Sequence, residues 1–161
     1  MLHYGHSGYP NSKVLFDGDM MVLDMGAEYC GYATDLTRSY PINGRFTERQ
    51  RAIHRAVCEA QQVVYGMLRA GVEWKDCHRA AERVVVRHLL ALGVLTNGSE
   101  EELCGKYLAS VFMPHGLGHL LGMNVHDVGG YPAGIQRETT PGLNWLRLGR
   151  KLEAGMVVTV E

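Results

Sequence analysis

The stretch PHGLGHLLGMNVHDVGG, residues 114–130, places three histidines, His115, His119 and His126, among five glycines. Neutral imidazole is the commonest nitrogen ligand of transition metals and also the usual proton carrier near pH 7. Glycines at this density permit backbone angles that other residues resist, and they let a ligand approach the main chain closely. The pattern therefore indicates a metal or catalytic site, with a glycine-rich turn containing satisfied histidines as the alternative.

Length and composition fit one globular domain. The chain has 161 residues, 46% of them hydrophobic and 20% charged, and a net charge of −1. This balance predicts no nucleic-acid or membrane partner, because there is no basic face and no apolar run near the roughly 20 residues that a membrane span needs. No signal peptide is visible at the N-terminus. The four cysteines form no C-x-x-C pair, so we expect reduced thiols and a cytoplasmic protein.

Apolar periodicity and turn residues predict strands, then two long helices, then strands again, which favours an α+β fold. Thr47 and Gln50 have the spacing of a capping box at the start of the first long helix. The expected strands are 20–24, 28–33, 36–40 and 156–161, with the first three forming an antiparallel meander. The expected helices are 46–71, 75–92 and 101–108. Their core-facing residues are expected to be Ile53, Val57, Ala60, Val64 and Met67 on the first, and Ala81, Val84, Val85, Leu89 and Leu92 on the second.

Three acids, Asp24, Asp35 and Glu161, each close a short apolar segment of β character. Taken singly, Asp24 and Asp35 could be turn or surface residues, because aspartate is mostly exposed. Three such acids together are harder to explain as surface, since a carboxylate in an apolar frame must be neutralised, paired or bound to a cation. With His119 added, the set suits Mn²⁺, Fe²⁺, Co²⁺ or Zn²⁺. Two such ions can activate water and polarise a carbonyl, which amide hydrolysis requires.

These residues lie in motifs that resemble those of the pita-bread dinuclear metallopeptidases, a family that includes methionine aminopeptidase, aminopeptidase P and prolidase. The motifs are VLDMG at 22–26, ATDLTR at 33–38, PHGLGH at 114–119 and TVE at 159–161. LHYGH at 2–6 and VHDVGGYP at 125–132 are most similar to the prolidase branch, the Xaa-Pro dipeptidases. The resemblance implies the pita-bread fold and hydrolysis of Xaa-Pro dipeptides by a hydroxide that bridges two divalent metals. It makes Mn²⁺ the expected ion, with Zn²⁺, Co²⁺ or Fe²⁺ as alternatives, and implies a homodimer.

The resemblance also implies roles for individual residues. Among the metal ligands, Asp24 would bind one ion, Asp35 would bridge both, and His119 and Glu161 would bind the other. His126 would face the substrate and stabilise the oxyanion, and His115 would support the site. His3 would line the same pocket. Arg147 would hold the substrate carboxylate in a fork geometry, unless it is a solvated loop arginine.

One departure from the family pattern concerns the ends of the sequence. The family has a fifth ligand, a second bridging glutamate, beyond the position of Glu161, and a separate N-terminal domain. Residues 1–161 are therefore expected to be a partial metallopeptidase catalytic domain, incomplete at both ends and inactive alone. Two alternatives stay open: an exopeptidase like aminopeptidase P, which releases the residue before proline, and a non-catalytic fragment that acts as a binding module.

Overall fold

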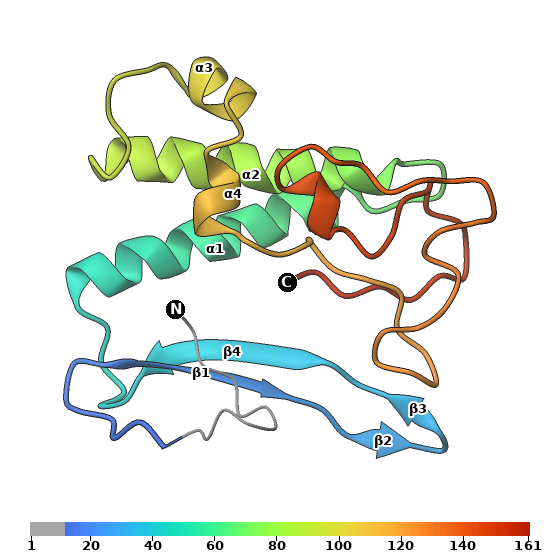
Figure 1. Cartoon of the computed structure of the whole chain (residues 1–161). Coiled ribbons are helices and arrows are strands. Elements are labelled where there is room, and N and C mark those ends of the chain that lie inside the picture. The colour runs from blue at the N-terminus through green and yellow to red at the C-terminus, as the bar shows by residue number, and fades with distance from the viewer. Residues whose placement is uncertain (1–11) are drawn as a thin grey trace.

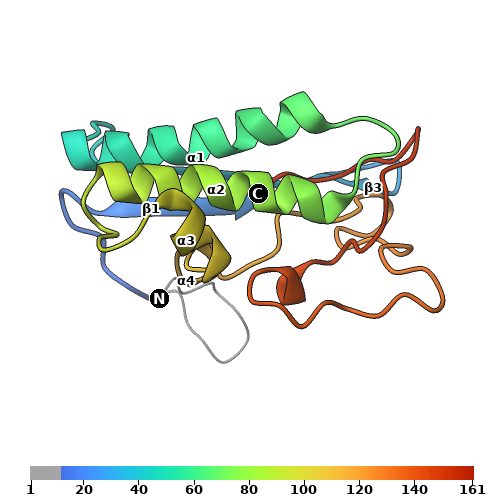
Figure 2. The ribbon, with the colours of Figure 1, turned by 90° about the horizontal axis from the view of Figure 1, so that it is seen from above.

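A computed structural model describes residues 12–161 and shows two layers (Figure 1). Helices α1 (Glu48–Met67) and α2 (Trp74–Ala91) lie side by side in one layer, and a two-stranded ribbon runs along them in the other (Figures 1 and 2). The C-terminal third runs beside both layers with little regular structure. This mixture of helix and strand confirms the α+β expectation. In the described part of the chain, no helix has both the length and the apolar character needed to cross a membrane.

The ribbon corrects the predicted three-stranded meander. Strand β1 (Met20–Met25) pairs antiparallel with β4 (Leu36–Pro41), and the short strands β2 (Glu28–Tyr29) and β3 (Tyr32–Ala33) pair with each other at its tip. The expected strand 28–33 is therefore a hairpin that turns at Cys30 and Gly31, which both have positive φ, 52° and 81°. Such angles belong to a type I′ hairpin turn. The turn escaped prediction because cysteine is not a usual turn residue.

The helices begin and end close to the predicted positions, although α1 ends at Met67 and not at Gly71. Thr47 and Gln50 form the predicted capping box. The expected helix 101–108 is divided into α3 (Glu100–Gly105) and α4 (Ala109–Phe112), because Tyr107 adopts φ 57° and interrupts the helical backbone. A single 3₁₀ turn, η1 (Leu143–Trp145), occurs in the C-terminal third.

The core lies between α1, α2 and the C-terminal third. Its largest fully buried side chains include Trp74, Leu117, Leu146 and Leu148. Two predictions about α1 were wrong: Ile53 and Val57 are 44% and 51% exposed, and Ala56 is buried beside Ala60 and Val64. On α2, Leu92 is likewise exposed and Val86 is fully buried. The predictions for Ala60 and Val64 on α1, and for Ala81, Val84 and Leu89 on α2, are confirmed, because these side chains are buried.

The four cysteines are free thiols, as expected. A buried polar pair lies on α2, where His78 Nε2 is 3.3 Å from Glu82 Oε1. Burial opposes ionisation of Glu82, but hydrogen bonds and positive charge from His78 and Arg79 outweigh it and lower the pKa of this carboxyl. The pair lies against Gly142, which has no room for a side chain. The His78–Glu82 pair therefore helps the loop around residue 142 to pack against α2.

Candidate metal centre

Two segments that are 40 residues apart pair in antiparallel fashion and bring His119 and Glu161 together. The predicted strand 156–161 does pair, but with residues 117–121 through an isolated bridge between Leu120 and Val158. Backbone hydrogen bonds run from Thr159 N to His119 O at 2.9 Å and from Glu161 N to Leu117 O at 2.7 Å. Because side chains alternate along extended segments, His119 and Glu161 are diagonal neighbours on one face.

A glycine makes this pairing possible. A Cβ atom on Gly118 would lie 2.1 Å from the carbonyl oxygen of Thr159, closer than packed atoms can approach. Any other residue would push the two backbones apart. Gly118, the glycine before His119, therefore lets two backbone segments pack together. The sequence predicted only that glycines in this stretch permit close approach to the main chain, without saying what would approach.

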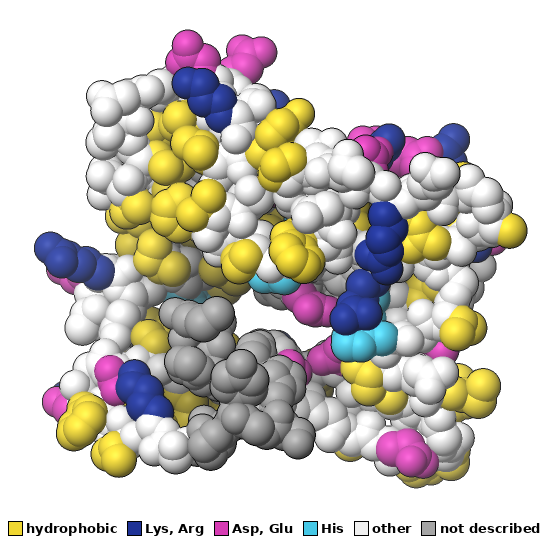
Figure 3. All heavy atoms as spheres, in the orientation of Figure 1, with side chains coloured by type: hydrophobic (Ala, Val, Ile, Leu, Met, Phe, Trp, Pro, Cys, Tyr) yellow, Lys and Arg dark blue, Asp and Glu magenta, His cyan; other side chains and the backbone are white. Residues whose placement is uncertain are grey.

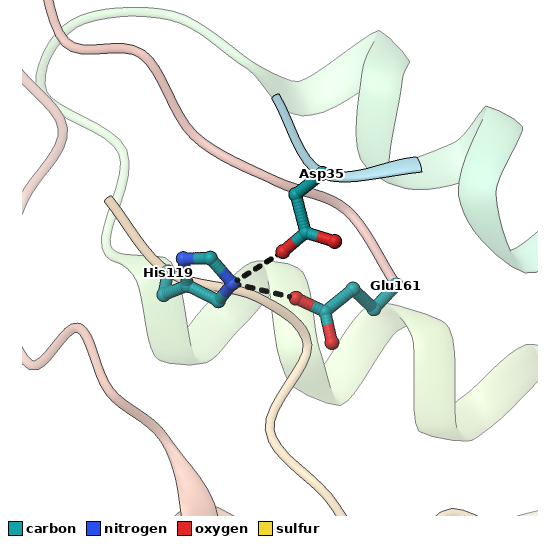
Figure 4. A group of neighbouring side chains, drawn as sticks. All are labelled: Asp35, His119 and Glu161. Carbon is teal, nitrogen blue, oxygen red and sulfur yellow. Dashed lines mark hydrogen bonds and ion pairs between the residues drawn. The ribbon is translucent and has the colours of Figure 1, made fainter. Parts of the chain in front are cut away.

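Asp35 reaches the same place from the ribbon. The N–H of Ala33 donates to the carbonyl of Gly122 at 2.9 Å, which fixes the ribbon tip to the histidine stretch. The Asp35 side chain is 14% exposed, and its Oδ2 lies 3.1 Å from His119 Nε2 (Figure 4). Glu161 Oε1 lies 3.0 Å from the same nitrogen. One ligand atom from each of the three residues falls within 4.8 Å of the others, a group that can hold a metal ion.

The tautomer of His119 strengthens that interpretation. Its Nδ1 lies 2.8 Å from the carbonyl oxygen of Leu120, an acceptor, so Nδ1 carries the hydrogen. In the neutral ring, Nε2 then presents a lone pair toward two carboxylate oxygens that are also acceptors. Such an arrangement is favourable only with a cation between the three atoms, either a proton on Nε2 or a metal ion. The donor set therefore fits a divalent metal.

Thr159 holds His119 and Glu161 in place, although it was not predicted to be a site residue. Its hydroxyl donates to Glu161 Oε1 at 2.8 Å and accepts from the N–H of His119 at 3.1 Å. Hydrogen bonds of this kind orient metal ligands. The signal was available in TVE at 159–161, because a residue two positions before a ligand on an extended segment shares its face.

Asp24 lies outside the group of three. It is exposed on β1 and pairs with Thr37 of β4. The hydrogen bond from Thr34 N to Ala27 O, 2.8 Å, continues the β1–β4 register toward the tip, so residue 26 lies opposite Asp35. Residues 24 and 26 share a face of the ribbon, which makes Asp24 and Asp35 diagonal neighbours. The ribbon thus repeats the arrangement of the His119–Glu161 pair.

A cavity of about 240 Å³ opens beside the Glu161 carboxylate, lined by residues that include His115, His119, His126, Arg147 and Glu161. Figure 3 shows histidine, carboxylate and basic side chains next to one another at a hollow between the two layers. The His126 ring meets the His119 ring edge to face, with centroids 4.5 Å apart. Trp145 also lines the cavity and was not predicted. His3 lies outside the described residues.

Two cavity residues differ in their electrostatic surroundings. His126 is exposed by area, yet desolvation of its ring, followed by the positive charges of Arg147 and His119, lowers its pKa. Arg147 forms no ion pair within 4.0 Å among residues 12–161. By contrast, the three arginines of α2, Arg79, Arg83 and Arg87, each form one with a glutamate. An arginine without a carboxylate partner at a cavity wall is available to an anionic ligand. His115 Nδ1 lies 2.9 Å from the carbonyl of Gly116, which fixes its ring orientation.

Comparison with known proteins agrees with this geometry. The sequence matches Metallopeptidase family M24 over residues 1–161, the whole chain. The chain belongs to this family. It is 50% identical over 161 residues to the Xaa-Pro dipeptidase of Mus musculus, covering all of this chain and 32% of that protein. The M24 chain thus spans about a third of the length of that curated relative.

Solved structures of the family show the same fold. Proline aminopeptidase P II from Yersinia pestis is 38% identical, with a TM-score of 0.80 over 94% of this chain and 32% of that chain. A zinc-substituted Escherichia coli aminopeptidase P in complex with product is 39% identical, with a TM-score of 0.76 over 89% of this chain and 30% of that chain. The M24 chain therefore has part of the pita-bread fold, as the resemblance implied.

Proposed function

We propose that the protein is a metal-dependent Xaa-Pro dipeptidase of family M24, and that residues 1–161 contribute most of its active site. The observation that carries the proposal is the group of facing acceptor atoms on Asp35, His119 and Glu161, beside Arg147, which has no ion-pair partner among residues 12–161. A metal centre supplies hydrolytic chemistry, and a free guanidinium supplies recognition of a terminal carboxylate. The 50% identity to a Xaa-Pro dipeptidase supports the choice of substrate class.

In this proposal the centre holds two divalent ions. His119 and Glu161 would bind one ion and Asp24 the other. Asp35, which belongs to the ribbon pair and has its Oδ2 3.1 Å from His119 Nε2, would bridge them. When bound, the ions supply Lewis-acid activation of water and of the scissile carbonyl. We expect Mn²⁺, with Zn²⁺, Co²⁺ or Fe²⁺ as alternatives, because carboxylates and one imidazole accept all four. The zinc-substituted E. coli aminopeptidase P supports this tolerance.

The cavity residues would orient the dipeptide. His126, beside His119, would donate a hydrogen bond to the carbonyl oxygen as negative charge develops there, and His115 would support the same wall. Arg147 would bind the C-terminal carboxylate of the substrate with two parallel hydrogen bonds. His3 is proposed to line the same pocket. A dipeptide ends one residue past the scissile bond, so its carboxylate can reach a fixed arginine.

The specificity test compares Gly-Pro with Gly-Pro-Ala in the protein at its native length. We expect Arg147→Ala to lower kcat/KM for Gly-Pro by about 100-fold, the loss of a charge-assisted carboxylate contact, and to change the tripeptide rate little. Arg51→Ala, an exposed arginine on α1, is the matched control. Equal losses on both peptides would favour an activity like that of aminopeptidase P, or an arginine without a role in binding.

The activity of residues 1–161 alone is a separate proposal. We propose that this polypeptide does not hydrolyse Gly-Pro measurably, because four carboxylate and imidazole ligands hold two mutually repelling cations weakly without a second bridging carboxylate. Proline release with excess Mn²⁺ measures it, and turnover that His119→Ala abolishes would contradict it. The cytoplasmic location and the homodimer stay predictions. Light scattering during gel filtration tests the dimer, and a monomer at micromolar concentration would exclude it.

A further inference from the structure

The side chain of Arg147 has no ion-pair partner among the described residues, so its direction depends on how its backbone is held. Three glycines surround that backbone closely. A Cβ atom on Gly130 would lie 2.0 Å from the carbonyl oxygen of Arg147, and one on Gly116 would lie 2.8 Å from that of Trp145. A Cβ on Gly149 would lie 2.3 Å from the Tyr131 ring. The segment 145–149 is therefore packed directly against the histidine stretch and the residues that follow it.

The peptide group immediately before Arg147 has two side-chain donors. The hydroxyl of Tyr131 donates to the carbonyl oxygen of Leu146 at 3.0 Å, and the guanidinium of Arg137 donates to the same oxygen at 2.7 Å. The Arg137 guanidinium also lies 4.7 Å from the centroid of the Tyr131 ring, a cation–π contact. Two donors on one carbonyl restrict rotation of the peptide plane from which Arg147 extends.

Further contacts hold the other side of the segment. The N–H of Gly149 donates to the carbonyl of Gly130 at 2.8 Å, and the neighbouring Leu146 and Leu148 side chains are buried. Arg147 thus extends toward the cavity from a backbone that is held on both sides. Among residues 12–161, Tyr131 and Arg137 are the only residues whose side chains hydrogen-bond to the backbone of residues 145–149.

We propose that Tyr131 and Arg137 form a clamp on the Leu146 carbonyl that positions Arg147 to bind the carboxylate of the substrate. The clamp is a specificity device: it acts on the carboxylate end of the ligand and not on the metal centre. Neither residue touches the substrate, so both are positioning residues. The inference rests on the proposed function for the identity of the ligand, and on the contacts above for the clamp itself.

The test uses the double variant Tyr131→Phe/Arg137→Met in the protein at its native length. Phenylalanine keeps the ring on Gly149 and removes only the hydroxyl, and methionine keeps the aliphatic length. The matched control is Arg51→Met, because Arg51 also lies over an aromatic ring, that of Phe46, and donates to that residue's carbonyl, but at the start of α1. Substrates are Gly-Pro and Gly-Pro amide, which lacks the carboxylate.

We expect the double variant to raise KM for Gly-Pro roughly tenfold, as for the loss of a hydrogen bond from a charged donor, with kcat nearly unchanged. Gly-Pro amide should change less than about twofold, because it offers Arg147 no carboxylate. In an Arg147→Ala background the clamp substitutions should have no further effect on Gly-Pro. Equal changes with both substrates, or a further tenfold loss without Arg147, would overturn the clamp.

A second measurement separates the clamp from the proposed function. Hydrogen exchange of the amides of residues 145–149 should be about tenfold faster in the double variant than in Arg51→Met, since local opening follows the lost contacts. Unchanged exchange overturns the clamp whatever the activity. If the unmodified protein does not hydrolyse Gly-Pro, the dipeptidase proposal fails, and faster exchange still supports the positioning of residues 145–149.

Discussion

The β1–β4 ribbon and the paired segments 117–121 and 157–161 are two versions of the same antiparallel arrangement. Each places two predicted metal ligands in diagonal positions: Asp24 and Asp35 on the ribbon, His119 and Glu161 on the paired segments. They differ in burial. His119 and its neighbour Thr159 are 3% and 7% exposed, whereas Asp24 is exposed and most ribbon side chains face solvent. The other two residues do not follow this difference, because the Asp35 side chain is 14% exposed and the Glu161 side chain is 38% exposed.

The paired segments and the ribbon are also attached to the rest of the fold in different ways, so the proposed metal centre has a core side and a ribbon side. The paired segments are joined to the core through Leu117 and to α1 through a hydrogen bond from Gln61 to the Val160 carbonyl, 2.8 Å. The ribbon reaches the histidine stretch at its tip, through Ala33 and Gly122. The proposed ligands on the core side are therefore the more preorganised, and those on the ribbon side depend on a tether. Preorganised ligands contribute more to affinity because less ordering accompanies binding.

The largest expected effect is on metal affinity, when one proposed ligand is removed from each side in turn. His119→Ala should lower Zn²⁺ affinity by more than about 100-fold, since even the groups that support ligands contribute 10- to 100-fold. Asp24→Asn should remove a weaker second ion and leave the tighter one. Titration calorimetry measures both, with His54→Ala on α1 as the control. Loss of the tighter ion in Asp24→Asn would place the dominant site on the ribbon.

Asp35 belongs to the ribbon but lies 3.1 Å from His119 Nε2 on the core side, so it should respond as a bridge. We expect Asp35→Asn to abolish hydrolysis and to lower the metal content by both ions, because its carboxylate serves each of them. Metal analysis after gel filtration, with proline release measured in parallel, gives the result. Two retained ions with full activity would refute the bridging role.

The next largest effect is expected on stability, when the close approach of the two backbones on the core side is disturbed. Gly118→Ala should lower the free energy of unfolding by about 2–3 kcal/mol, because its Cβ would lie 2.1 Å from the Thr159 carbonyl. Gly66→Ala, in α1 with open space around it, should instead raise stability by about 0.5–1 kcal/mol. Urea denaturation compares them. Equal stability of the two variants would show that the paired segments separate easily.

Thr159 should contribute less than a ligand. Thr159→Val removes the hydroxyl that joins His119 N–H to Glu161, and we expect about a tenfold loss of Zn²⁺ affinity. Thr139→Val is the control, because Thr139 is exposed in the loop 131–140, away from the proposed ligands, and its hydroxyl forms no hydrogen bond within residues 12–161. An unchanged affinity in Thr159→Val would mean that the core alone orients both ligands.

The smallest expected effect is on the ribbon. The Thr34 hydroxyl accepts from the Ala27 N–H at 2.8 Å and donates to the Ala27 carbonyl at 3.2 Å, in an exposed part of the tip. Thr34→Val should therefore cost only about 1 kcal/mol of unfolding free energy, the low end of the net value of two exposed hydrogen bonds. Thermal unfolding monitored by circular dichroism measures it. A loss as large as that of Gly118→Ala would show that the ribbon is as integral to the fold as the paired segments.

The sequence by itself determined the features that depend on a few neighbouring residues. The Thr47–Gln50 capping box and the approximate helices follow from interactions within one turn, so local pattern predicts them. The residue types of the proposed metal site, carboxylates and one imidazole, were predicted from their chemistry, and the structure brings three of them together. The family motifs likewise preserve ligand identity. The hairpin turn at Cys30 and Gly31 was missed because an ordinary residue adopts an unusual backbone angle there.

Only the tertiary structure decided how distant segments meet. The pairing of His119 with Thr159, the tautomer that turns the His119 Nε2 lone pair toward two carboxylates, and the two donors on the Leu146 carbonyl each involve groups whose positions depend on the packed core. Sequence spacing carries no information about which backbone atoms will be within 3 Å. Those contacts arise when buried groups must satisfy their hydrogen bonds inside one particular packing.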